Sequence, residues 1–235
     1  MNKIATILSL TCVFLITSCS NEKLEEKGFQ VTSASDNPES DPNSGLNRDS
    51  LKFETRPSNV LLTNVPNVRL TTIYKVNVNK KDNTKFIGSN KVYYKYDETD
   101  ENLGNNWNNK LMPGLESIYG YNLINISHYD IKEDTVKKFF EKPVLIKTLY
   151  YPSFSKDTLN GKPVNRDYFM VSVYNDDTNK DGFINLKDLR RLYLFDINGV
   201  RQKALIPEGY SVFKSEYDSD NDFMYVFAQL DINTA

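Results

Sequence analysis

Oxygen-bearing side chains recur at alternate positions in residues 177–188, whose sequence is DTNKDGFINLKD. Calcium binds through six to eight hard oxygen ligands, and alternate side chains on a tight loop can converge on one point. A glycine permits the sharp turn that such a loop needs. We therefore predict a calcium ion as the cofactor, held by Asp177, Asn179, Asp181, the carbonyl of Phe183, Asn185 through a water molecule, and Asp188. The alternative interpretation is an acidic hairpin tip without an ion.

Numbered from Asp177, this stretch resembles an EF-hand calcium loop over its full length, with Gly182 at the sixth position. Aspartate at the last position, Asp188, within INLKDLRRLYL, is more similar to the dockerin form. An EF-hand has a helix before the loop, whereas residues 168–176, YFMVSVYND, have the pattern of a strand. The resemblance thus implies a structural calcium loop set into a β-hairpin, and not a sensor that opens on binding.

Two further features limit that resemblance. A dockerin carries two such loops, and only one complete loop is present, so a cohesin-like partner is not expected. The related stretch YDSDNDF, at 217–223, lacks the glycine and is interpreted as a turn between two strands.

Catalytic residues are not indicated by any motif. The chain has one histidine, His128, and a lone histidine in a strand is more often packed or exposed than catalytic. No strained nucleophile turn of the G-x-S-x-G type accompanies it. A carboxylate pair for glycoside cleavage cannot be singled out among 31 acidic residues. We therefore name no catalytic residue and expect a non-enzymatic protein.

The N-terminus has the layout of a secretory signal, with a short basic start followed by an apolar run. The run is shorter than the roughly 20 residues that a helix needs to span a bilayer. The run ends in Ile16-Thr17-Ser18-Cys19, which resembles the lipobox of bacterial lipoproteins. The resemblance implies a signal peptide at 1–18 and lipidation of Cys19, which would hold the protein on the membrane. A plain signal peptide with an incidental cysteine is the alternative.

The next segment indicates where the protein is displayed. The acidic cluster SNEKLEE, at 20–26, resembles the export tag of surface-displayed lipoproteins, although a solvated tether explains it equally. We therefore expect a lipid-anchored protein of the bacterial outer membrane or cell surface. Removal of Lys3 with the signal changes the formal charge from −2 to −3, which argues against a nucleic-acid partner.

Composition divides the mature chain into a tether and one domain. Residues 28–50 are rich in Ser, Asn, Asp and Pro, with Phe29 as the only aromatic, so residues 19–50 are predicted to be a flexible tether. Residues 51–235 are numerous enough for one domain with a sizeable core.

The domain is predicted to be all-β. Seven short segments are rich in Val, Ile, Thr, Tyr and Phe and are mostly bounded by turn residues. They are 67–78, 90–97, 121–131, 142–151, 166–176, 190–197 and 222–231. In the fifth segment, alternation places Phe169, Val171 and Val173 on one face and Tyr168, Met170 and Tyr174 on the other.

A repeat favours a β-propeller-like arrangement of antiparallel blades. INISHYDIKEDTVKKFF, at 124–140, parallels LYLFDINGVRQKALI, at 192–206, and later strands begin after Asp167 and Asp222. Strand, aspartate-bearing turn and strand at this spacing resemble a propeller blade in pattern only. A β-sandwich of similar strands is the alternative. The alignment also predicts that the final strand has an unpaired edge.

Taken together, the sequence favours a lipid-anchored cell-envelope protein with a structural calcium site, acting as a binding or interaction module for a protein or glycan partner. The alternative is a surface hydrolase or glycan-processing lipoprotein with unidentified catalytic residues. A deep pocket with converging carboxylates would favour the hydrolase, and a flat or aromatic-lined face would favour the binding module.

Overall fold

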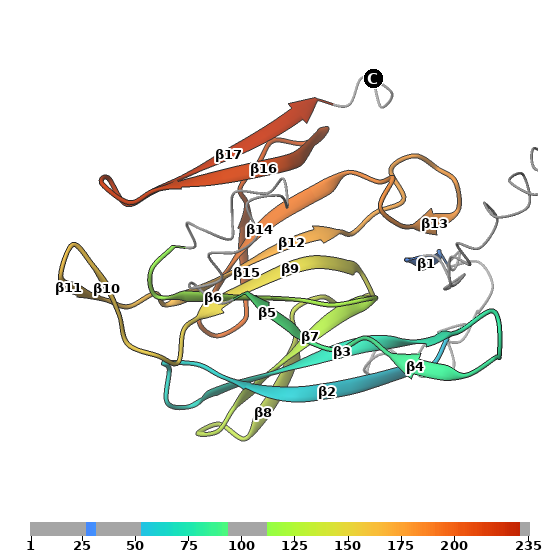
Figure 1. The fold of residues 1–235 in the computed structure, drawn as a ribbon, viewed down its shortest axis with the longest axis horizontal. Helices are drawn as coiled ribbons and strands as arrows, with labels where there is room; N and C mark the ends of the chain where they lie inside the picture. The colour runs from blue at the N-terminus through green and yellow to red at the C-terminus, as the bar shows by residue number, and fades with distance from the viewer. Residues whose placement is uncertain (1–26, 32–52, 94–111, 231–235) are drawn as a thin grey trace, which may run out of the picture.

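The computed structural model describes residues 27–31, 53–93 and 112–230. These residues form an all-β structure of several antiparallel sheets, shown in Figure 1. Within the described ranges no helix is long and apolar enough to cross a membrane. The predicted signal peptide, Cys19 and most of the predicted tether lie outside the described residues.

The seven predicted strand segments each contain a strand. They are β3 (Val68–Val78), β5 (Lys91–Tyr93), β7 (Leu123–Asp130), β9 (Leu145–Pro152), β12 (Tyr168–Tyr174), β14 (Arg190–Asp196) and β17 (Phe223–Leu230). The prediction of an all-β domain is confirmed, because β-branched and aromatic residues in short runs between turn residues suit a pleated, half-buried surface.

Two larger sheets hold most of these strands. One has six strands in the order β15-β14-β12-β9-β6-β5, with β6 at Leu115–Tyr119 and β15 at Arg201–Ala204. The other has the order β2-β3-β7-β8, with β4 paired to β3. In this sheet β2 is Thr55–Leu62, β4 is Lys85–Ile87 and β8 is Thr135–Lys138. None of the described strands closes either sheet into a barrel.

The main core lies between these two sheets and draws side chains from both. Leu70 of β3 and Ile126 of β7 belong to the same buried cluster as Phe169 and Val171 of β12. Phe195 of β14 is also in the cluster and is fully buried. The sheets therefore form facing layers, as Figure 1 shows.

A hairpin of β16 (Tyr210–Asp218) and β17 covers the opposite face of the six-stranded sheet, at the top of Figure 1. Met170 of β12 and Leu192 of β14 pack there with Val212 and Tyr217 of β16. The predicted division of β12 is thus confirmed, since Phe169 and its alternate residues face the main core and Met170 faces the hairpin.

The two strands aligned by the sequence repeat have different surroundings. β12 lies inside the six-stranded sheet between β9 and β14, whereas β17 pairs only with β16 among the described strands. The turns of the repeat are more alike. Asp130 at the end of β7 and Asp196 at the end of β14 both accept backbone N–H groups of the turn that follows. The repeat therefore describes two similar hairpins, placed in different sheets.

Two small pairs complete the described part. β10 (Asp157–Leu159) pairs with β11 (Lys162–Val164) at one end of the molecule. β1 (Phe29–Gln30) pairs with β13 (Phe183–Ile184), which lies within the predicted calcium loop. Residues 27–31 of the predicted tether are therefore docked on the domain.

Candidate calcium loop and binding surfaces

The predicted calcium loop connects β12 to β14, which are antiparallel neighbours with Tyr174 opposite Arg190. The loop is therefore set into a β-hairpin, as the strand pattern before it predicted. Gly182 has a φ of 84° and Lys180 a φ of 60°, so the backbone makes left-handed turns within the loop. Glycine adopts this conformation without the steric cost that other residues incur.

The predicted ligand side chains fold the loop by accepting its own backbone N–H groups. The Asp177 carboxylate accepts N–H groups of Asp181 at 3.1 Å and Gly182 at 2.9 Å. Asp181 accepts the N–H of Phe183 at 2.9 Å. Asn185 accepts the N–H of Lys187 at 2.7 Å. Short polar side chains favour such local turns, so the same residues that make the loop oxygen-rich also shape it.

Two other predicted ligands contact the Asp181 carboxylate. The carboxamide nitrogens of Asn179 and Asn185 donate to the same Asp181 oxygen, at 3.1 and 3.2 Å. Burial opposes the charged form of Asp181, but the hydrogen bonds from Asn185 and the Phe183 N–H hold its pKa below the usual value. The carboxylate is thus ionised at neutral pH and already surrounded by polar groups.

Asp188 closes the far side of the loop. It is buried, and its carboxylate accepts the N–H groups of Thr178 and Asn185, both at 2.8 Å. Leu189 in turn donates its N–H to the Thr178 hydroxyl at 2.8 Å. The last position of the predicted loop therefore links the start of the loop, at Thr178, to its end, at Asn185.

The donor set is compatible with calcium but is not a carboxylate cluster. Across the part of the chain that the structure describes, no group of three or more His, Cys, Asp or Glu side chains is arranged to hold a metal. The six predicted ligands include two asparagines and a main-chain carbonyl, which are hard oxygen donors of the kind that calcium accepts. A cation beside Asp181 would compete with the two asparagine N–H groups that now contact it.

The docked N-terminal segment is hydrogen-bonded to this loop and to Asn122. Val31 donates its N–H to the Gly182 carbonyl at 2.9 Å, and Gly28 donates to the Asn122 side chain at 2.8 Å. Gly28 has a φ of 116°, and a Cβ there would lie 2.3 Å from the Ile184 carbonyl oxygen, so glycine is required. The sequence signal for this docking was Phe29, the only aromatic of a polar segment.

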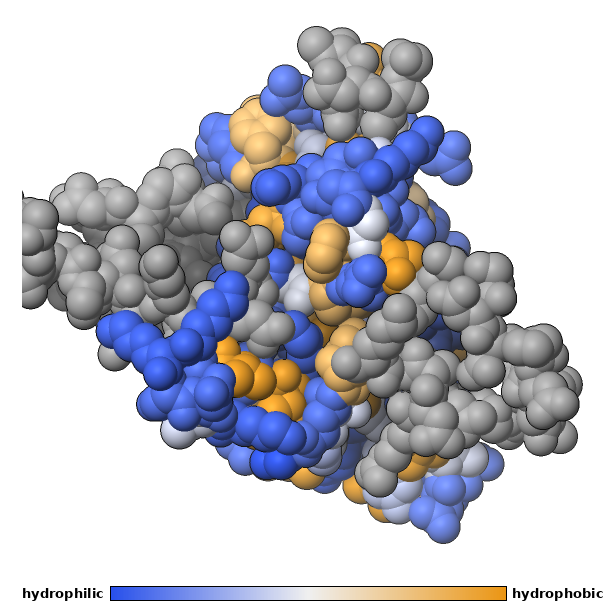
Figure 2. Space-filling view, turned by 90° about the vertical axis from the view of Figure 1, so that its right-hand side faces the viewer, coloured by the Kyte–Doolittle hydropathy of each residue, from blue (hydrophilic) through white to orange (hydrophobic). Residues whose placement is uncertain are grey.

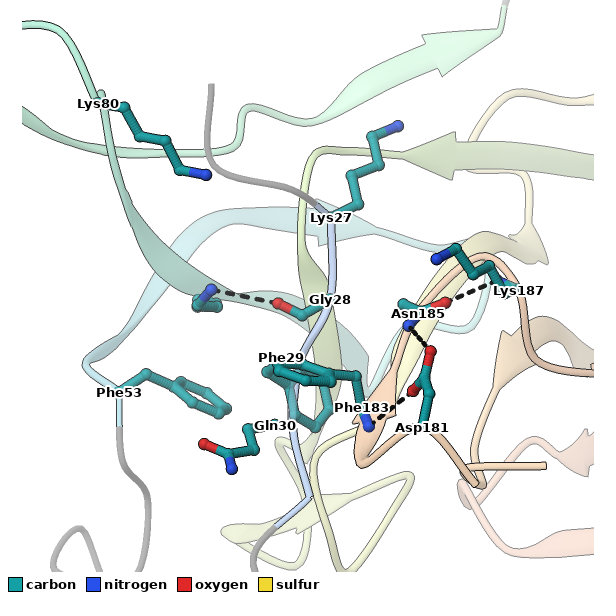
Figure 3. A pocket seen from close by; sticks show the side chains of 11 residues that line it. Lys27, Gly28, Phe29, Gln30, Phe53, Lys80, Asp181, Phe183, Asn185 and Lys187 are labelled. Carbon is teal, nitrogen blue, oxygen red and sulfur yellow. Dashed lines mark hydrogen bonds between the residues drawn. The ribbon is translucent and has the colours of Figure 1, made fainter. Parts of the chain in front are cut away.

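Between the docked segment, the end of β3 and the calcium loop lies a cavity of about 650 Å³. Lys27, Lys75, Lys80 and Lys187 line it, and Asp181 is the one carboxylate among its described lining residues. In Figure 3 Lys80 lies at the upper left, Lys27 above Gly28 and Lys187 at the right, while Phe29 and Phe53 lie lower. We call this feature the lysine cavity. Sequence reasoning missed it, because its walls come from segments far apart in the chain.

His128 has a packing role. Its ring is buried, its Nε2 lies 2.9 Å from the Ile197 carbonyl oxygen, and it contacts the rings of Phe139 and Phe169. A ring nitrogen that faces a main-chain carbonyl acts as an N–H donor, so this nitrogen is not free to accept a proton.

Aromatic side chains gather on the outer face of the β16–β17 hairpin. Phe223 and Tyr225 are 61% and 52% exposed and alternate along β17. Phe213 of β16 is 53% exposed and packs against Phe227, with ring centroids 6.1 Å apart. We call Phe213, Phe223, Tyr225 and Phe227 the aromatic face. The sequence showed the aromatic residues, but not that they would cluster.

Polar groups accompany these rings. The Lys214 ammonium lies 4.4 Å from the centre of the Phe227 ring and forms an ion pair with Glu216 at 2.7 Å. The turn at the end of the hairpin is the predicted one, with Asp218 accepting N–H groups of the residues that follow.

Comparisons of the chain with protein-family models, with curated proteins and with solved structures find no match in any of the three.

Proposed function

We propose that this chain is a lipid-anchored binding module of the bacterial cell envelope that holds a saccharide chain on the aromatic face. The observation that carries the proposal is the exposure of Phe223 and Tyr225 on one side of β17, beside Phe213. In a water-exposed domain such a row of rings costs solubility, so it is expected to have a binding role.

A saccharide suits this face because the face is both aromatic and polar. The C–H faces of sugar rings pack on aromatic rings, while sugar hydroxyls need hydrogen-bond partners. Lys214 and Glu216 supply such partners next to Phe227. Alternate residues on a strand lie about 7 Å apart, which lets Phe223 and Tyr225 contact successive parts of an extended chain.

For the fold, we infer a layered β-sandwich and not propeller blades. The main core is shared by the two larger sheets, and Ile126 and Phe169 belong to one cluster although they lie in opposite sheets. Propeller blades are instead arranged radially around a central channel.

The calcium loop is proposed to act as a structural staple. Asp177, Asn179, Asp181, Phe183, Asn185 and Asp188 would hold the ion, whose charge would offset the repulsion among the loop carboxylates. The ion would thereby secure β12 to β14 and support β1 through β13. The membrane partner would be reached through an acyl group on Cys19, at the outer membrane or cell surface.

The hydrolase alternative receives less support from the described residues. The described lining of the lysine cavity has a single carboxylate, whereas glycoside hydrolysis uses a pair. Glu116 accepts hydrogen bonds from Tyr151 at 2.7 Å and Ser153 at 2.9 Å, as expected of a carboxylate with a structural role.

The test is retention of the full chain on insoluble envelope polysaccharide, compared with a Phe223→Ala/Tyr225→Ala variant. Loss of two rings should weaken retention by about tenfold or more. Phe154→Ala is the matched control, because Phe154 is 60% exposed but lies in the loop between β9 and β10. Equal retention of all three proteins would overturn the proposal. Release of new reducing ends from the polysaccharide would favour the hydrolase.

A further inference from the structure

The lysine cavity has an excess of positive charge at its walls. Of the charged residues that line it within the described ranges, four are lysines and one is Asp181. The carboxylate that follows Phe53 does not neutralise them, because Glu54 is paired with Arg56 at 2.7 Å and with Lys85 at 3.1 Å. A concave site lined by one sign of charge concentrates ions of the opposite sign.

One of these lysines is built into the wall. Lys75 is only 6% exposed, and its ammonium donates to the Gly28 carbonyl at 3.2 Å and lies 5.9 Å from the centre of the Phe53 ring. Placing a charged side chain inside the fold is costly unless polar groups compensate it. The ammonium of Lys75 is therefore held in position at the base of the docked segment.

The positive charge extends from Lys27 in the cavity wall to Lys147 and Arg190 outside it. Lys27 lies over the ring of Tyr121, with the ammonium 5.5 Å from its centre. Burial, together with the charges of Lys27 and Arg190, lowers the pKa of Lys147 on β9. Like charges thus already interact at this end of the molecule, and Figure 2 shows hydrophilic residues around a small apolar patch there. A bound anion would relieve this repulsion.

The remaining lining residues are aromatic or neutral and polar. Phe53 and Phe183 provide ring surface, while Gln30 and Asn185 provide amide groups. Phe183 is 47% exposed, so part of its ring is available to a ligand. Ring surface, amides and ammonium groups together match the apolar faces, hydroxyls and acidic groups of a charged sugar. Cavities of this volume suit small ligands.

We propose that the lysine cavity binds an anionic saccharide of about disaccharide size through its carboxylate or sulfate groups. Lys80 and Lys187 contact the acidic groups from opposite walls, and Lys75 supplies a fixed charge below them. This site is separate from the aromatic face, and its ligand differs from a neutral polysaccharide by its charge.

The test is calorimetric titration of the full chain with three disaccharides at low salt: digalacturonate, a disulfated disaccharide and a neutral disaccharide. A short acidic peptide is the fourth probe. Each titration is repeated in a chelator, which excludes a calcium ion that bridges the charged sugar to the loop. Binding of either charged sugar, with no binding of the neutral sugar, is expected. The carboxylated and sulfated probes show which acidic group is preferred.

A Lys80→Gln/Lys187→Gln variant should weaken binding of the charged sugar about tenfold. Lys137→Gln/Lys138→Gln is the matched control, because it removes the same charge from the exposed strand β8 and should change the affinity less than about twofold. Raising the salt from about 0.05 to 0.5 M should also weaken binding to the unmodified chain, which tests the charges without any substitution.

Four results would overturn the proposal: no binding of either charged sugar, equal binding of the neutral sugar, tighter binding of the acidic peptide, or an affinity that salt and the cavity variant leave unchanged. Loss of binding in the Phe223→Ala/Tyr225→Ala variant would place the site on the aromatic face instead. The two proposals can therefore fail separately.

Discussion

Phe29 stands directly opposite Ile184 in an antiparallel pair, which fastens a residue of the predicted tether to the predicted calcium loop. The two side chains share a buried cluster with Tyr174, the last residue of β12. The position of β1 on the domain is therefore set by the loop. Whatever stabilises the loop should also stabilise this docked segment.

Replacing Phe29 with alanine should release β1. Phe29 is 7% exposed and packs against Phe53 with ring centroids 5.1 Å apart, so its removal should cost up to about 3 kcal/mol of local stability. Hydrogen exchange at the Val31 amide, which now donates to Gly182, should accelerate. Val31→Ala is the control, since that side chain is 38% exposed and should change little. Unchanged exchange in Phe29→Ala would show that the backbone pairing alone holds β1.

Calcium should stabilise the chain through Asp181. If the affinity is on the order of 10⁻⁴ M, calcium at about 1 mM adds about 1.4 kcal/mol to the free energy of unfolding. Asp181→Ala should lower the melting temperature in calcium and change it little in chelator. Asp176→Ala, outside the predicted ligand set, is the control. The loop would be an acidic turn without an ion if the unmodified chain melted identically with and without chelator and calorimetry showed no calcium uptake.

The Arg166–Asp222 pair should make attachment of the β16–β17 hairpin sensitive to acid. Arg166 donates to both Asp222 oxygens, at 2.6 and 3.0 Å, and these bonds lower the pKa of Asp222. A lowered pKa in the folded state means that the stabilisation is present above the unfolded pKa of about 4 and is lost as the pH falls through the folded value. Asparagine tolerates the left-handed backbone at this position, where φ is 56°. Asp222→Asn should therefore lower the free energy of unfolding by about 1 kcal/mol at pH 7.

Thermal melts across pH test this directly. The difference in melting temperature between the unmodified chain and Asp222→Asn should be complete above about pH 5 and should shrink below pH 4. Asp220→Asn in the same turn is the control, because the carboxylate that accepts the turn amides is that of Asp218. A difference that persists unchanged at pH 3 would assign the effect to hydrogen bonding without charge.

Cys19→Ala should abolish membrane attachment. The resemblance of residues 16–19 to a lipobox predicts acylation of this cysteine, and acyl chains are the only anchor that the sequence indicates. The variant should leave the membrane fraction, and mass spectrometry of the native N-terminus should find a lipidated Cys19. An unmodified cysteine at that position would contradict the anchor.

The sequence by itself determined seven strand segments, the two faces of β12 and the turn-forming character of the loop. Phe169 and Met170 could be assigned to opposite faces because strand side chains alternate with a period of two. Asp177 and Gly182 could be placed in a tight loop because their preferences are local. These are properties of neighbours in the chain, so no knowledge of packing was needed.

Only the tertiary structure decided which strands pair and what each face meets. Both faces of β12 are apolar, so alternation could not say that one meets the second sheet and the other a hairpin. The aromatic face depends on the hairpin burying Val212 and Tyr217, which turns Phe223 and Tyr225 outward. The lysine cavity joins β1, β3 and the calcium loop, and contacts between such distant segments are set by the packing of the whole domain and not by local preference.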